Sequence, residues 1–96
     1  MNYASGTHHI VIPQNGRISK TVVFPHNKFT EAPLVLITVK RNPIFSYYAK
    51  QINAYVLDVS KDSFSFEVKN CDGSNYIPTT DDKINWVAFK VDITNE

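Results

Sequence analysis

Apolar residues recur at every second position in several short runs, and polar turn residues separate these runs. The alternation is clearest at residues 52–56, 64–68 and 84–88. Successive side chains of a strand point to opposite faces, so a period of two is typical of strands with one buried face. No stretch shows the period of an amphipathic helix. The pattern therefore predicts an all-β chain.

The limits of the runs predict six strands. Short strands joined by close polar turns favour an antiparallel β-sandwich. Pro13–Gly16 and Ser60–Ser63 have the composition of turns. The expected strands are Thr7–Ile12, Arg17–Phe24, Leu34–Lys40, Tyr47–Val59, Phe64–Lys69 and Lys83–Val91.

Three positions carry more specific predictions about packing. The near-continuous apolar run Leu34–Ile37 indicates burial on both faces, either in the sandwich core or at a subunit contact. Phe29, in the connection after the second strand, is expected to plug the sheet from below. Trp86 is expected to be a core residue of the closing strand.

Size and composition bound the class of protein. The 96 residues are expected to form a single domain, 1–96. Charged residues make up 20% and hydrophobic residues 43%, which predicts a folded chain. The net charge is +1 and no basic run exceeds Lys40-Arg41, so we expect no nucleic-acid groove. Cys71 is the only cysteine, which excludes an intramolecular disulfide.

The residues that could carry catalysis or bind a metal are scattered. His8 and His9 are adjacent on a strand, so they point to opposite faces and do not form a metal pair. Cys71 has no histidine near it in sequence. Asp81 and Asp82 are interpreted as a solvated turn rather than a carboxylate pair. We therefore expect no enzyme, no cofactor and no metal.

The start of the sequence, residues 1–6, lacks the apolar segment of a signal peptide. No apolar run approaches the length of a membrane span. A cytoplasmic, unconventionally secreted or virion-associated location is therefore expected.

The spacing of the core residues from Thr21 to Phe89 resembles one family, the H-type lectin domain. That family includes snail agglutinins and the C-terminal domain of slime-mould discoidins, and similar modules occur in phage tail and fibre proteins. The matching residues are Val23, Phe24, Phe29, Pro33, Leu34, Val35, Ala54, Val56, Val59, Phe64, Phe66 and Ile84–Ala88.

The resemblance implies a six-stranded antiparallel β-sandwich that forms a homotrimer or a dimer of trimers. It also implies sites for galactose or N-acetylgalactosamine in the clefts between subunits. The loop at 70–82 offers Asp72 to accept bonds from two sugar hydroxyls, Asn75 to donate and accept, and Tyr76 as an aromatic ring. Gln51 of the same subunit, and Asn15 or Arg17 of the next, complete the expected site.

The sequence departs from the family pattern at three contacts. Gln51 stands where the family has an arginine, the connection Gln14–Arg17 has no carboxylate, and the binding loop has no tryptophan. Two functions therefore remain open: a sugar-binding module with changed specificity, or a structural trimerisation domain of a phage tail, fibre or baseplate protein. A plain turn at Cys71–Ser74 and a sandwich of another family are the alternatives to the resemblance.

Overall fold

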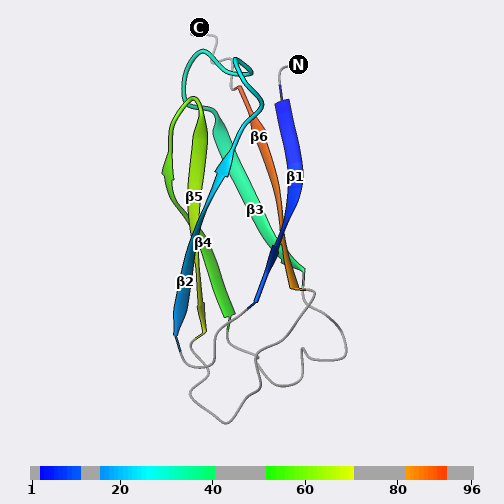
Figure 1. Ribbon diagram of the computed structural model, residues 1–96, viewed down its shortest axis with the longest axis vertical. Helices are drawn as coiled ribbons and strands as arrows, with labels where there is room; N and C mark the ends of the chain where they lie inside the picture. Colours follow the sequence, from blue (N-terminus) through cyan, green and yellow to red (C-terminus); the bar gives the residue numbers. More distant parts are fainter. Residues whose placement is uncertain (1–2, 12–15, 41–51, 71–81, 91–96) are drawn as a thin grey trace, which may run out of the picture.

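The computed structural model describes residues 3–11, 16–40, 52–70 and 82–90. In these residues the chain forms six strands in two three-stranded antiparallel sheets (Figure 1). This confirms the prediction of an all-β antiparallel sandwich. The strands are β1 (Tyr3–Ile10), β2 (Arg17–Val23), β3 (Leu34–Lys40), β4 (Ile52–Val59), β5 (Ser63–Asn70) and β6 (Asp82–Phe89).

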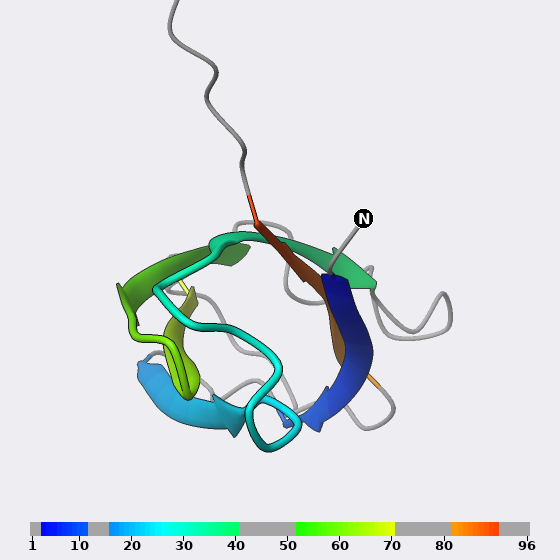
Figure 2. The same cartoon turned by 90° about the horizontal axis from the view of Figure 1, so that it is seen from above.

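The two sheets have the strand orders β1-β6-β3 and β2-β5-β4, and they face each other across the core (Figure 2). β5 and β6 are the central strands, so their inner side chains are the most deeply buried. β3 and β4 lie beside each other where the sheets meet along one side.

Aromatic rings fill the centre of the sandwich and join the two sheets. Phe64 and Phe66 of β5 are almost completely buried. The Trp86 ring of β6 lies 5.4 Å from the Phe64 ring and 5.8 Å from the Phe24 ring. Aromatic pairs at such distances add about 0.5–1.5 kcal/mol each beyond the burial of their area. The predicted core role of Trp86 is confirmed.

The connection 24–33 crosses one end of the sandwich and closes it (Figure 2). Its first backbone N–H, from Phe24, donates to the carbonyl of Asp62 at 2.8 Å. Asn27 has a positive φ of 57°, which asparagine tolerates in a turn. Phe29 is 5% exposed and packs edge-on against Phe24 at 5.1 Å. Phe29 is therefore the plug that the sequence predicted.

β1 begins at Tyr3, four residues before the strand start expected at Thr7. Its inner face starts with Ala4 and Gly6, so the apolar alternation is too weak to be read from the sequence. Gly6 faces Trp86: a Cβ at Gly6 would lie 3.0 Å from the Cζ2 and Nε1 atoms of the indole. The small inner side chains of β1 thus leave the space that Trp86 occupies.

Of the two alternatives for the run at 34–37 the structure excludes the core, so the subunit contact stays a prediction, and the prediction of a solvated turn at Asp82 was wrong. The side chains of Leu34 and Leu36 are 48% and 53% exposed, because they point away from the sandwich while Val35 points into it. The run at 34–37 is therefore not a core segment on both faces. Asp82 is fully buried inside β6, opposite Ile10 of β1, and is no solvated turn. Residues 12, 47–51 and 91, expected in strands, lie outside the described residues.

Replacing Gly6 with valine should destabilise the chain by about 1–3 kcal/mol, because the added atoms overlap the Trp86 indole and overpack the core. Urea denaturation followed by Trp86 fluorescence measures this. Ser19→Val is the matched control: Ser19 of β2 is exposed on the outer face of the other sheet, so its change should stay within about 0.5 kcal/mol. Equal stability of the two variants would contradict the described packing.

Replacing Trp86 with alanine should cost about 3 kcal/mol or unfold the chain, since it removes the ring that contacts both Phe24 and Phe64. Thermal denaturation by far-ultraviolet circular dichroism measures the loss. A melting temperature within a degree or two of that of the unmodified chain would show that the contacts of Trp86 with Phe24 and Phe64 contribute little to stability.

Candidate functional site

Most residues of the predicted sugar site cannot be placed. Asn15, Gln51, Asp72, Asn75 and Tyr76 lie outside the described residues. Arg17 is described: it begins β2, and its side chain is 67% exposed. Its Nη1 atom lies 3.6 Å from Oε1 of the mostly buried Glu67, a long contact for an ion pair. The guanidinium is thus oriented by one carboxylate and reachable from solvent.

The described strands that come before and after the predicted site residues have their ends at the same end of the sandwich. In one sheet Ile10 pairs with Asp82, and in the other Ile52 pairs with Asn70. The backbone N–H of Asn70 also donates to the carbonyl of Gly16 at 2.8 Å. The chain therefore leaves and re-enters the described strands at one end of the sandwich, opposite the β4–β5 turn (Figure 1).

The outer face of the β1-β6-β3 sheet carries apolar side chains at one end. The register aligns Tyr3, Phe89 and Leu34 in one row, and Val87 and Leu36 in the next. Tyr3, Leu34 and Leu36 are each about half exposed. We call these five residues the apolar face. Contiguous exposed apolar patches on a protein surface usually mark an interaction site.

The character of this outer face changes along the strands. The next row is polar, and in it the Thr7 hydroxyl donates to Asn85 Oδ1 at 2.9 Å. The last row is basic, and contains His9, Lys83 and Lys40. A shallow groove of about 340 Å³ runs between the first two rows and the polar row. It is lined by Leu36, Thr38, Asn85, Trp86 and Val87.

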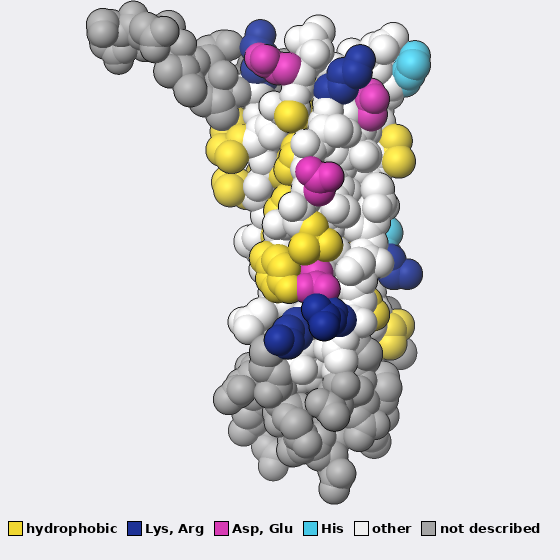
Figure 3. Space-filling model, turned by 90° about the vertical axis from the view of Figure 1, so that its left-hand side faces the viewer, with side chains coloured by type: hydrophobic (Ala, Val, Ile, Leu, Met, Phe, Trp, Pro, Cys, Tyr) yellow, Lys and Arg dark blue, Asp and Glu magenta, His cyan; other side chains and the backbone are white. Residues whose placement is uncertain are grey.

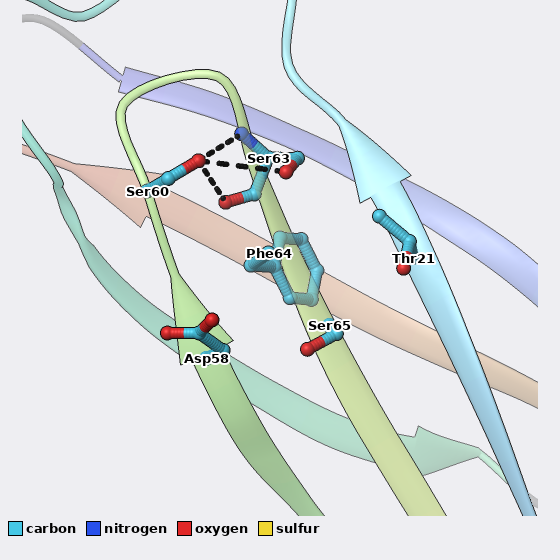
Figure 4. A pocket seen from close by; sticks show the side chains of 6 residues that line it. All are labelled: Thr21, Asp58, Ser60, Ser63, Phe64 and Ser65. Atoms are coloured by element: carbon cyan, nitrogen blue, oxygen red, sulfur yellow. Dashed lines mark hydrogen bonds between the residues drawn. The ribbon is translucent and has the colours of Figure 1, made fainter.

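A second hollow lies on the outer face of the β2-β5-β4 sheet, beside the β4–β5 turn (Figure 4). We call it the Asp58 pocket. Its volume is about 160 Å³, and hydroxyl groups and one carboxylate make up its polar lining. The residues that line it are Thr21, Asp58, Ser60, Ser63, Phe64 and Ser65.

The turn beside the Asp58 pocket is held by its own serines. Ser60 Oγ lies 3.2 Å from the backbone nitrogens of Asp62 and Ser63 and accepts from both. The Ser60 N–H donates to the Ser63 carbonyl at 2.8 Å. Side chains that bond to nearby backbone in this way fix a tight turn. The wall of the pocket is therefore ordered without any ligand.

A β-bulge turns Asp58 outwards. In the ladder of β4 with β5, Val56 pairs with Phe66 and Asp58 pairs with Ser65, so Leu57 is an extra residue. Without the bulge, strict alternation would place Asp58 on the same face as Val56, in the core. The three-residue spacing from Val56 to Val59 was the sequence signal of this break, but the sequence alone did not identify the pocket.

The remaining titratable side chains of the described residues are dispersed. Within residues 3–11, 16–40, 52–70 and 82–90, no three side chains of His, Cys, Asp or Glu come together to hold a metal. The same residues contain no helix that could cross a membrane. His8 points inwards and packs edge-on against Phe66 at 5.7 Å, while His9 is exposed. The two histidines therefore lie on opposite faces, as predicted.

The comparisons with known proteins support the fold. No family model matches the chain, and no curated protein matches its sequence. Among solved structures, the chain is similar to the tailspike protein gp49 from Pseudomonas phage LKA1, with a TM-score of 0.70 and 21% sequence identity. The similarity covers 93% of this chain but only 15% of that one. The chain thus resembles one part of a phage tailspike protein in its fold.

Proposed function

We propose that this chain is a structural domain through which a phage tail or fibre protein assembles, and that its copies pack as a homotrimer through the apolar face. The half-exposed row of Tyr3 and Leu34, continued by Leu36, carries the proposal. A chain that stayed alone would keep these side chains in water, at a cost of about 25 cal/mol for each Å² of apolar surface. The fold shared with part of a tailspike protein supports the same role.

The change from apolar to basic rows restricts how copies can meet. If two copies packed with opposite strand directions, the apolar rows of one would cover the Lys83 and Lys40 ammonium groups of the other. Burying an unpaired charge costs several kcal/mol. Packing with strands parallel around a common axis joins apolar rows and keeps the basic rows at one end. Closed cyclic assemblies have this geometry, and the resemblance to H-type lectins implies three copies.

The size of the face indicates how strong the contact can be. The whole outer face of the β1-β6-β3 sheet, with three strands of seven or eight residues, about 4.8 Å apart and rising about 3.4 Å per residue, covers roughly 14 × 27 Å, and the apolar face is part of it. Stable interfaces bury about 800 Å² on each partner. The face alone is smaller than that, so association of the isolated chain should depend on concentration.

Leu36→Glu should shift the chain from oligomer to monomer, because the new carboxylate would be buried without a partner at the centre of the contact. Light scattering after size exclusion over a range of concentrations measures this. Circular dichroism should be unchanged, since Leu36 is already half exposed in the single chain. Thr30→Glu, an exposed position in the connection 24–33, makes the same charge change and should stay oligomeric. A wild-type chain that is monomeric at every concentration would contradict the proposal.

Sugar binding is the second candidate function. Its proposed site is the cleft between neighbouring subunits, with galactose or N-acetylgalactosamine held by the residues named from the resemblance. Several strands end at the same end of the sandwich, where Ile10 pairs with Asp82 and Ile52 pairs with Asn70. This arrangement favours sugar binding, because segments that begin there can contribute to one site. The exposed guanidinium of Arg17 at the same end supplies a donor for sugar hydroxyls.

Asp72→Ala should abolish binding of galactose and N-acetylgalactosamine and leave the melting temperature nearly unchanged. Calorimetry and a glycan array on the oligomer measure the two effects. Asp62→Ala, which removes an exposed carboxylate from the β4–β5 turn, is the control and should bind normally. If the unmodified oligomer binds no glycan at millimolar concentration, or Asp72→Ala binds as well as the wild type, this second function is wrong.

A further inference from the structure

We infer that the Asp58 pocket binds a neutral sugar ring or a similar small polyol, with Tyr55 as an aromatic wall beside it. The pocket lies on the outer face of the β2-β5-β4 sheet, whereas the apolar face lies on the other sheet. It is built from one chain and shares no residue with the apolar face. The inference therefore does not depend on the proposed assembly.

The polar lining matches the hydroxyls of such a ligand. An ionised carboxylate has about four acceptor positions, and at Asp58 the Val59 N–H uses one of them, at 3.0 Å. The others can accept from two adjacent ligand hydroxyls, in charge-assisted bonds that are about twice as strong as neutral ones. The hydroxyls of Thr21 and Ser65, in the same cross-strand row, can each donate or accept.

Tyr55 does not line the pocket but lies one cross-strand row beyond it. It is 41% exposed and occupies the next outward position of β4, opposite Glu67. Rows on one face of a strand are about 7 Å apart, so the ring is within reach of a ligand held at Asp58. Hydrophobic and acidic side chains lie beside one another on this side of the molecule (Figure 3). A flat aromatic surface next to a carboxylate suits a sugar, which has both an apolar face and a rim of hydroxyls.

Other small ligands fit this lining less well. Calcium takes six to eight oxygen ligands, usually including several carboxylates, and among the lining residues Asp58 is the single carboxylate. A phosphate or sulfate would be repelled by Asp58, and no lysine or arginine lines the pocket to offset the repulsion. A neutral ligand rich in hydroxyls avoids both difficulties.

The site is also separate from the one expected in the loops. The Asp58 pocket lies beside the β4–β5 turn, while the strand ends at Arg17 and Asn70 lie at the opposite end of the sandwich (Figure 1). Variants at Asp58 and at Asp72 therefore report on different sites.

Nuclear magnetic resonance of the full ¹⁵N-labelled chain tests the inference, with the methyl glycosides of glucose, galactose and mannose titrated into the millimolar range. At least one glycoside should shift the backbone amides of Thr21, Asp58 and Ser65. Asp58→Asn should weaken that binding about tenfold or more. The asparagine keeps an oxygen for the Val59 N–H, so the fold is retained. Tyr55→Ala should weaken it about two- to tenfold.

Two control variants distinguish binding at the Asp58 pocket from the loss of a nearby charge and from binding at Asp72. Asp62→Asn removes a nearby carboxylate that does not line the pocket and should bind as the wild type does. Asp72→Ala should leave the shifts of Thr21, Asp58 and Ser65 intact. The inference is overturned if no glycoside moves these amides, if Asp58→Asn binds as tightly as the wild type, or if calcium chloride moves them and the glycosides do not.

Discussion

The packing of Trp86 across Gly6 is the contact on which the rest of the structure depends. The indole needs the space that β1 leaves by having no side chain at this position. From there it reaches Phe64 of the opposite sheet and Phe24 of the connection 24–33. Phe24 in turn bonds to the β4–β5 turn through its backbone N–H. One ring thus links both sheets, the end of the sandwich and the turn beside the Asp58 pocket.

The side chains that are buried on the inner face of each strand also determine which side chains are exposed on its outer face. Side chains alternate along a strand, so burial of Ile84 and Ala88 sends Val87 and Phe89 outwards. The result is two outer surfaces of different character on the two sheets. The apolar face suits protein contact, while the Asp58 pocket presents hydroxyls and a carboxylate. The proposed assembly and the proposed ligand pocket therefore use different surfaces of the chain.

Much of the fold could be predicted because a strong period of two leaves few alternatives. The runs around Val56, Phe66 and Trp86 each identified a strand and its buried face, and Phe29 was recognised as the plug. β1 was recognised only in part, since Ala4 and Gly6 carry no apolar signal. The sequence left two alternatives open for Leu34 and Leu36, because an unbroken apolar run looks the same whether its second face meets a core or another molecule. The burial of Asp82 was not predicted, because it depends on the pairing of β6 with β1, which is distant in sequence.

The sequence by itself determined the all-β class, the inner faces of the strongly alternating strands and the aromatic core, because these follow from local alternation and from residue size. Only the tertiary structure decided which outer residues become neighbours. Tyr3, Leu34 and Phe89 are distant in sequence and meet through the register of three strands. Asp58 reaches the outer surface through a single bulge, beside Thr21 and Ser65 of two other strands. Surface sites of this kind arise from pairing between strands that are distant in sequence, and the alternation within one strand does not specify which strand lies beside it.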